Sequence, residues 1–192
     1  MNAPNILAFA GSLRADSFNK KLVKIAAQGA RAAGAKVTYL DLRDYPLPVF
    51  DQDLEAKDGP PGNARKLKEL LKDNEGFLIA SPEYNSSVTA ALKNMIDWTS
   101  RPATGEAPLA CFDGKSVALM SASPGSLGGL RGLVHVRSIL GNIGVLVLPD
   151  QVSVPQAHEA FSADGSLKDP KKQKAVEDLG KDLTDLLKKL AF

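Results

Sequence analysis

Three short segments of this chain combine glycine, hydroxyl and amide side chains in ways that suit ligand binding. The first, from Gly11 to Asn19, lies directly before a stretch with helical periodicity. The free N–H groups at the start of a helix, together with the helix dipole, attract anions. Ser12, Ser17 and Asn19 can each donate a hydrogen bond. Arg14 can add a charge-assisted one, so the segment predicts a phosphate site unless Ser17 only caps the helix and Arg14 is solvated.

This first segment lacks the two commonest nucleotide-binding patterns. The Gly-x-x-x-x-Gly-Lys-Ser/Thr sequence of ATP-binding loops is missing. The Gly-x-Gly-x-x-Gly sequence of dinucleotide-binding folds does not follow the first apolar run either. A cradle for a single phosphate therefore fits better than a site for ATP or a dinucleotide.

A second segment follows an apolar run and reads Ser81-Pro82-Glu83-Tyr84-Asn85-Ser86-Ser87. Pro82 restricts the backbone, and Asn85 tolerates a turn conformation. Such a rigid polar loop can present its N–H and C=O groups to the edge of a planar heterocycle, and Tyr84 adds a flat amphipathic surface. The alternative is an ordinary turn between a strand and a helix, closed by a capping serine or threonine.

A third segment reads Ser123-Pro124-Gly125-Ser126-Leu127-Gly128-Gly129. Three glycines in five residues allow the backbone to approach something flat. Helix capping and tight packing explain some of these glycines, and we expect a ligand to explain the rest.

Composition excludes several other classes of function. The chain has 192 residues, of which 44% are hydrophobic, and 24 basic against 22 acidic side chains give a net charge of +2. This balance provides no broad surface for nucleic acid. No apolar run reaches the roughly 18–20 residues of a membrane span, and no signal peptide is recognisable, so we expect a cytoplasmic protein. One cysteine, Cys111, and two distant histidines, His135 and His158, predict neither a disulfide nor a metal site.

The elements that must position the three segments follow from an alternation of short apolar runs with helical patterns. Strands are expected at 5–10, 36–41, 76–80, 116–121 and 144–148, and helices at 17–33, 60–74, 89–99, 127–141 and 170–190. Residues 43–59 are expected to form a loop. This order predicts a single α/β domain over residues 1–192, with a parallel sheet covered on both faces. Ligands of such sheets bind beyond the carboxyl ends of the strands, where the three segments lie.

Three motifs resemble one known family. They are Gly11-Ser12-Leu13-Arg14-x-x-Ser17-x-Asn19, Pro82-Glu83-Tyr84-Asn85 and Leu92-Lys93-Asn94-Met95-Ile96-Asp97-Trp98. On these motifs the chain resembles the NADPH-dependent FMN reductases, a branch of the flavodoxin-like flavoproteins, over about residues 5–148. It is most similar to the bacterial quinone, chromate and azo-dye reductases of that family.

The resemblance implies a flavodoxin-like three-layer sandwich, with a five-stranded parallel sheet in the order 2-1-3-4-5. It implies bound FMN, and it assigns the phosphate of FMN to Ser12, Arg14, Ser17, Phe18 and Asn19. The isoalloxazine ring is expected to border Pro82, Glu83, Tyr84 and Asn85 on one side, and Ser123 and Gly125 on the other. The loop from Ser121 to Gly125 matches the family only loosely.

The activity implied is an NAD(P)H-dependent oxidoreductase that works by ping-pong hydride transfer through FMN, with NADPH or NADH as cosubstrate. Because the chemistry would lie on the cofactor, no catalytic side chain is expected. Quinones, azo compounds, chromate and free flavin are the expected small-molecule acceptors, and the resemblance implies a homodimer or homotetramer. A flavodoxin-type electron carrier without its own nicotinamide activity is the alternative, although such carriers are usually acidic. A flavin-free interaction module is a third possibility.

Several conspicuous residues are expected to have structural roles. His135 is predicted to make packing or subunit contacts, and His158 to be exposed. Cys111 is expected to be semi-buried without a basic neighbour. Asp97 and Trp98 are predicted to anchor the helix at 89–99, and the charges of 168–189 to form a solvated helix face.

Overall fold

Five strands form the central sheet in the order β2-β1-β3-β4-β5, and every neighbouring pair is parallel. In this computed structural model, which describes residues 2–190, the strands are β1 (Asn5–Ala10), β2 (Lys36–Leu40), β3 (Gly76–Ala80), β4 (Ser116–Ala122) and β5 (Leu146–Val154). β3 and β4 are buried along their whole length, as strands covered on both faces should be. The predicted order and direction of the strands are confirmed.

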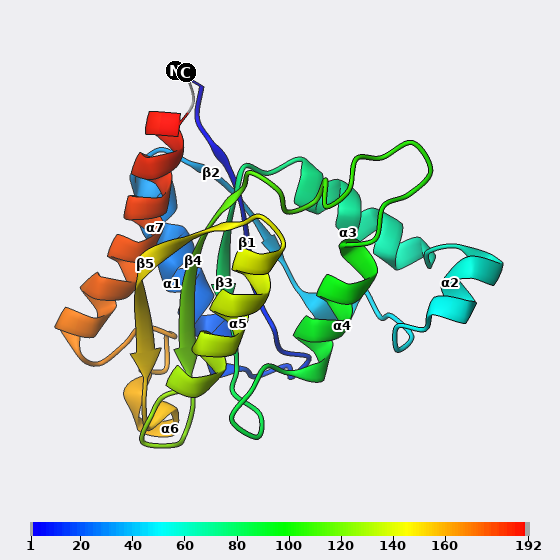
Figure 1. Cartoon of the computed structure of the whole chain (residues 1–192). Helices are drawn as coiled ribbons and strands as arrows, with labels where there is room; N and C mark the ends of the chain where they lie inside the picture. Colours follow the sequence, from blue (N-terminus) through cyan, green and yellow to red (C-terminus); the bar gives the residue numbers. More distant parts are fainter. Residues whose placement is uncertain (1, 191–192) are drawn as a thin grey trace.

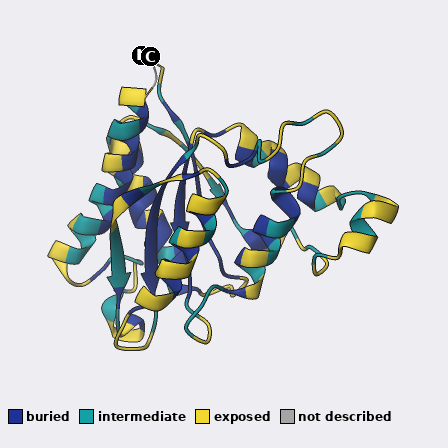
Figure 2. Ribbon diagram, viewed as in Figure 1, coloured by how far each residue is buried: buried dark blue, intermediate teal, exposed yellow. Residues whose placement is uncertain are grey.

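Helices cover the sheet in two layers (Figure 1). α1 (Phe18–Ala32) and α7 (Pro170–Leu190) form one hydrophobic core with one face of the sheet. α3 (Gly62–Lys72), α4 (Ala90–Thr99) and α5 (Leu130–Asn142) form a second core with the other face. Figure 2 shows that these helices have buried and exposed sides. The predicted three-layer sandwich is therefore confirmed.

The segment predicted as a loop at 43–59 contains helical turns, so that prediction is wrong in part. A 3₁₀ turn spans Leu42–Asp44, and the helix α2 spans Gln52–Asp58. The Asp51 carboxylate caps α2 by accepting hydrogen bonds from the N–H groups of Asp53 and Leu54, at 2.8 and 3.3 Å. Since α2 has no buried residue, it lacks the apolar stripe that indicates a helix in a sequence.

The fifth strand is longer than predicted and continues through Pro149. Its register against β4 shifts between Val117 and Leu119, which indicates a bulge opposite Ala118. β5 is an edge strand, and proline is tolerated at edges and bulges because its missing N–H breaks no ladder there. Pro149 therefore did not end the strand. A single-turn helix, α6 (Ala157–Ala160), follows β5.

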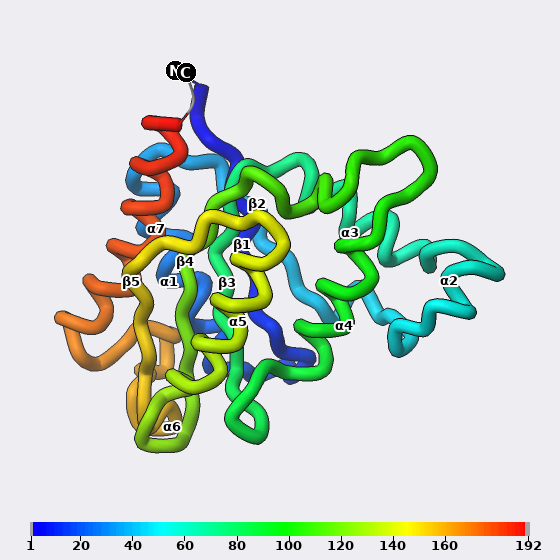
Figure 3. Tube along the Cα trace, in the orientation of Figure 1, coloured from blue at the N-terminus to red at the C-terminus, as the bar shows by residue number. Residues whose placement is uncertain are grey.

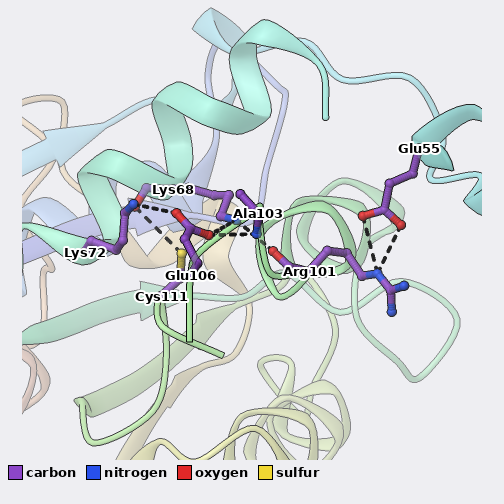
Figure 4. A network of polar contacts seen from close by, with 7 residues as sticks. All are labelled: Glu55, Lys68, Lys72, Arg101, Ala103, Glu106 and Cys111. Atoms are coloured by element: carbon purple, nitrogen blue, oxygen red, sulfur yellow. Dashed lines mark hydrogen bonds and ion pairs between the residues drawn. The ribbon is translucent and has the colours of Figure 1, made fainter. Parts of the chain in front are cut away.

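The connection from α4 to β4 is held against α3 by a network of polar contacts (Figure 4). Glu106 forms ion pairs with Lys68 and Lys72 of α3. Cys111 lies under this network and is 1% exposed, and its thiol is 3.7 Å from the carbonyl oxygen of Lys68. Burial raises the pKa of the Cys111 thiol. Cys111 is thus buried and not semi-buried as predicted, and the lysines near its thiol, Lys68 and Lys72, are distant from it in sequence.

Helices α1 and α7 pack with their backbones in contact. A Cβ atom added at Gly180 would lie 1.9 Å from the carbonyl oxygen of Ala26, and one added at Gly29 would lie 2.0 Å from that of Glu177. Neither carbonyl can move without breaking helical hydrogen bonds. These two glycines therefore set the distance between the helices.

We expect Gly180→Ala to lower the free energy of unfolding by about 1–3 kcal/mol, because the methyl group forces the helices apart. Urea unfolding followed by circular dichroism measures the change. Gly141→Ala on α5 is the matched control, since an added Cβ there meets nothing within 4 Å. The control should be neutral or stabilising by up to about 1 kcal/mol, and equal losses in both variants would contradict the close packing.

Of the helices within residues 2–190, none is both long and apolar enough to span a membrane.

Candidate functional site

The loops after β1, β3 and β4 meet at the edge of the sheet formed by the carboxyl ends of the strands (Figure 3). A cavity of about 60 Å³ lies between them. All the predicted site residues line it except Asn85 and Gly125, and Ala122 and Pro124 line it in addition. The structure thus brings residues from three distant parts of the sequence to one place.

The start of α1 has unpaired hydrogen-bond donors where the sequence predicts an anion site. The first helical hydrogen bond joins Lys21 N–H to the carbonyl oxygen of Ser17 at 3.2 Å, so the N–H groups of Phe18, Asn19 and Lys20 have no partner within the helix. Ser17 occupies the N-cap position, but its hydroxyl makes no capping hydrogen bond. The first turn contains no acidic side chain. A phosphate group can therefore accept hydrogen bonds from these N–H groups and from a hydroxyl that does not cap the helix.

Ser12 and Arg14 stand beside this helix start. Ser12 is 4% exposed, and its hydroxyl accepts a hydrogen bond from Arg14 N–H at 3.3 Å. The Arg14 side chain is exposed, and within residues 2–190 it forms no ion pair. The nearby carboxylate of Asp16 pairs instead with Lys21 at 2.7 Å, and this contact lowers the pKa of Asp16. The Arg14 guanidinium thus stays available for an anion.

The Asn19 side chain has a different role from the one predicted. Its Nδ2 donates to the carbonyl oxygen of Ala122 at 2.8 Å, and its Oδ1 accepts from Ala122 N–H at 2.9 Å. The amide therefore joins α1 to the end of β4. Only its second Nδ2 hydrogen and the backbone N–H of Asn19 remain for a ligand.

The loop after β3 folds into a tight hairpin. Tyr84 and Ser87 exchange two backbone hydrogen bonds of 3.0 Å. Asn85 and Ser86 between them have φ angles of 51° and 64°, as a two-residue type I′ turn requires. The prediction that Asn85 adopts a turn conformation is confirmed. Tyr84 is 53% exposed, so its ring surface is open to a ligand.

Thr89 joins this loop to the first one. Its hydroxyl donates to the carbonyl oxygen of Gly11 at 2.6 Å and accepts from Leu92 N–H at 3.1 Å, which caps α4. The capping threonine expected of an ordinary turn is therefore present, and it also ties two of the three loops together.

Glu83 turns away from the hairpin towards α5. Its Oε1 accepts from the Arg131 guanidinium at 2.8 and 3.0 Å, and its Oε2 accepts from Gly132 N–H at 3.1 Å. Burial alone would raise the pKa of Glu83, but the bonds from Gly132 and Arg131 outweigh it, and the pKa lies below its usual value. The carboxylate is ionised at neutral pH and fully occupied by α5.

Two of the three glycines of the third loop have structural causes, as expected for some of them. Gly128 and Gly129 have φ angles of 61° and 91°, in the left-handed region that favours glycine. A Cβ atom would lie 2.6 Å from Pro155 N at Gly128, and 1.8 Å from Ser121 Oγ at Gly129. At Gly125, by contrast, an added Cβ meets only Ser123 Oγ, at 3.7 Å. Only Gly125 leaves space for a ligand.

Of the two residues predicted to anchor α4, Trp98 does so and Asp97 does not. Trp98 Nε1 donates to the carbonyl oxygen of Pro48 at 2.9 Å. Asp97 pairs with Lys93 at 2.6 Å on the same helix, so this contact does not attach α4 to another element. His135 Nδ1 lies 2.8 Å from Ser87 Oγ, a contact that no local sequence pattern indicates. In the part of the chain that the structure describes, no three His, Cys, Asp or Glu side chains gather as a metal site.

The donor set fits a phosphate monoester better than other ligands. It combines backbone N–H groups, two serine hydroxyls and one guanidinium, and the one carboxylate at the cavity is held by α5. The cavity has room for a phosphate group, while a planar ring would lie across the open surface beside Tyr84. The residues present therefore fit FMN.

Comparisons with known proteins show to which family the chain is similar. The model of the NADPH-dependent FMN reductase family matches residues 4–159. A probable NADPH:quinone oxidoreductase 2 of Oryza sativa subsp. japonica is 33% identical over 186 residues, which cover 92% of this chain and 85% of that protein. An NAD(P)H-dependent FMN reductase of Pseudomonas aeruginosa is 34% identical over 173 residues, covering 90% and 89%.

Solved structures confirm the flavodoxin-like fold. The flavoenzyme NAD(P)H:(acceptor) oxidoreductase FerB of Paracoccus denitrificans superposes with a TM-score of 0.79 at 29% identity, over 97% of this chain and 98% of that one. A flavodoxin from the domain Archaea superposes with a TM-score of 0.65 at 13% identity, which supports the fold alone. By the match of the family model and the identity of these relatives, the chain belongs to the NADPH-dependent FMN reductase family.

Proposed function

We propose that the protein is an FMN-dependent NAD(P)H oxidoreductase that reduces quinones, or related acceptors such as azo compounds, chromate or free flavin, in a ping-pong cycle. The observation that carries the proposal is the start of α1, where unbonded N–H groups and the free Ser17 hydroxyl face a cavity shared with the other two loops. The quinone activity named for the Oryza sativa relative supports quinones as the first acceptor to test.

The chain's own residues would act by binding and positioning. Ser12, Ser17 and the N–H groups of the first turn of α1 would hold the phosphate of FMN, with Arg14 covering it from outside. Bound FMN would supply the redox chemistry, taking a hydride from NAD(P)H and passing its electrons to the acceptor.

The ring would lie between the hairpin after β3 and the loop after β4. Pro82, Tyr84 and Asn85 would border one side, and Ser123 and Gly125 the other. The Glu83 carboxylate is held by α5, so it offers no proton to a reaction at this site. Rate acceleration would therefore come from orientation rather than from acid–base catalysis. Because the site is an open surface, the nicotinamide and the acceptor can use the same space in turn.

An anaerobic titration tests this function. We expect the purified protein, incubated with FMN and desalted, to be yellow and to bleach on addition of NADPH or NADH. Parallel lines in double-reciprocal plots with varied acceptor would support the ping-pong cycle. Colour that both nicotinamides leave unchanged would indicate an electron carrier, and a protein that retains no FMN would overturn the proposal.

We further propose a cytoplasmic homodimer or homotetramer. Leu130 and Val134 of α5 are 41% and 59% exposed and Tyr84 is 53% exposed, and such apolar side chains are often covered by a second copy. Light scattering of the purified protein tests the oligomeric state, and a monomer at micromolar concentration would contradict this part.

Arg14→Ala should weaken FMN binding by about 10–100-fold, because a charge-assisted hydrogen bond to phosphate contributes about 1.5–3 kcal/mol. Quenching of flavin fluorescence on titration of the protein measures the dissociation constant. Arg43→Ala removes another exposed arginine, away from the cavity, and should leave the dissociation constant of FMN unchanged. Undiminished FMN binding by Arg14→Ala would count against the phosphate assignment.

A further inference from the structure

The hairpin Tyr84–Ser87 is attached to α5 at both of its ends. At the first end, the Glu83 carboxylate binds Arg131 and the N–H group of Gly132. At the second, Ser87 Oγ lies 2.8 Å from His135 Nδ1, one helical turn further along α5 than Arg131. The two contacts lie on the same side of the helix, since residues four apart in a helix share a face.

α5 has no N-cap side chain of its own. Its N-cap residue is Gly129, with φ at 91° and no capping hydrogen bond. The orphan N–H group of Gly132 in the first turn is instead satisfied by Glu83 from another loop. A carboxylate at this end of a helix also interacts favourably with the helix dipole. Glu83 therefore serves as the cap of α5.

The close approach of the loop to α5 depends on Gly132. A Cβ atom there would lie 3.1 Å from the carbonyl oxygen of Ser87 and 3.3 Å from Glu83 Cβ. The Glu83 side chain is only 8% exposed in this contact, and its two oxygens accept three hydrogen bonds. Little of the carboxylate is left for a ligand.

We propose that Glu83 is a positioning residue, which holds the hairpin at the angle that Tyr84 and Asn85 need to border the ring, and that it does not itself contact the cofactor. This inference rests on the proposed function, and it changes the role assigned to one residue of the Pro-Glu-Tyr-Asn motif. Glu83 would act on the ring indirectly. Its bonds to α5 fix the hairpin, and the hairpin carries the exposed Tyr84 side chain.

Hydrogen exchange of the protein without FMN tests the attachment of the hairpin to α5 independently of flavin binding. In Glu83→Ala we expect the Tyr84 and Ser87 amides, which pair with each other, and the Gly132 amide to exchange at least about five-fold faster, as for a lost helix cap. Amides of α1 should keep their wild-type rates. Glu83→Gln retains an acceptor oxygen for Gly132 N–H, so its exchange rates should lie between those of the wild type and those of Glu83→Ala.

The flavin-loaded protein tests the positioning role. We expect Glu83→Ala to change the visible circular dichroism of bound FMN and to lower kcat/KM for NADPH by about 10–100-fold, as small misplacements do. The FMN dissociation constant should change by less than about three-fold, because the Glu83 carboxylate is bound to α5 and makes none of the proposed contacts with the phosphate. Ser87→Ala should shift the same dichroism in the same direction.

Glu55→Ala is the matched control. It removes another Glu–Arg ion pair, in which Glu55 Oε2 lies 3.1 Å from Arg101 Nε, away from the cavity. Unchanged exchange and dichroism in Glu83→Ala, or changes no larger than in this control, would overturn the proposal. Lost FMN binding with unchanged exchange at the hairpin would also overturn it, because Glu83 would then act on the cofactor directly. If the wild-type protein binds no FMN, the proposed function fails. The exchange measurement alone then decides whether Glu83 attaches the hairpin to α5.

Discussion

A Ser17→Asp protein should fold as well as the wild type and yet lose FMN binding by at least about 1,000-fold. Aspartate is as good an N-cap residue as serine, and its charge is favourable at the positive end of α1. The same carboxylate would lie where the phosphate is expected to bind. Two unit charges of like sign about 4 Å apart near a protein surface repel each other by about 4 kcal/mol. Helix stability and ligand affinity should therefore change independently.

Thermal unfolding and fluorescence titration with FMN separate the two effects. Ser17→Ala should retain the fold and lose about ten-fold in affinity, as expected for one hydrogen bond to a charged group. Ser138→Asp places the same charge on the exposed face of α5 and should leave FMN binding unchanged. If Ser17→Asp bound FMN like the wild type, the phosphate could not lie at the start of α1.

Periodicity was sufficient to predict the strands at the centre of the sheet because β1, β3 and β4 are short apolar runs buried on both faces, and each covering helix has an apolar stripe. The elements that differ from the prediction, α2 and β5, lack a clear apolar pattern over their length. α2 contains no buried residue, and its capping residues, Asp51 and Gly59, were its only signals. β5 continues through Pro149 because an edge strand can bulge there. The expected strand order already placed this strand at the edge, but no local sequence pattern indicates the bulge.

The site was predictable where it depends on a local pattern. The Gly11–Asn19 segment contains its helix start and its donors within nine residues, so a phosphate site could be proposed from the sequence. The roles of Asn19 and Glu83 did not, because their partners lie 103 and 49 residues away along the chain. Likewise, the reason for Gly129 is the hydroxyl of Ser121, which only the folded chain brings within 1.8 Å of an added Cβ.

Glu106→Gln should lower the free energy of unfolding by about 3 kcal/mol at neutral pH. Lys68 is 4% exposed, and its ammonium group has Glu106 and the carbonyl oxygen of Arg101, at 2.7 Å, as partners. Glu106 also accepts from Lys72 at 2.7 Å and from Ala103 N–H at 2.9 Å (Figure 4). Removal of the carboxylate charge leaves a buried cation without its counter-ion, which is costly.

The loss should depend on pH in a defined direction. Hydrogen bonds from Lys68 and then from Lys72 lower the pKa of Glu106 in the folded protein from 4.5 to about 2. A lowered pKa means that the carboxylate adds stability above its unfolded pKa and that this stability is lost as the pH falls through the folded value. The difference between the wild type and Glu106→Gln should therefore be constant above about pH 5.5 and shrink between about pH 5 and 2.

Urea unfolding at several pH values measures this difference, and two further variants identify its cause. Glu69→Gln changes an exposed glutamate of α3 and should cost less than about 0.5 kcal/mol. Lys68→Met combined with Glu106→Leu removes both charges, and it should be more stable than Glu106→Gln alone because no buried ion is left unpaired. A Glu106→Gln deficit that is as large at pH 3 as at pH 7 would show that lost packing, and not the lost charge, destabilises the connection from α4 to β4. Since this network lies away from the cavity, FMN affinity in all three variants should stay at the wild-type value.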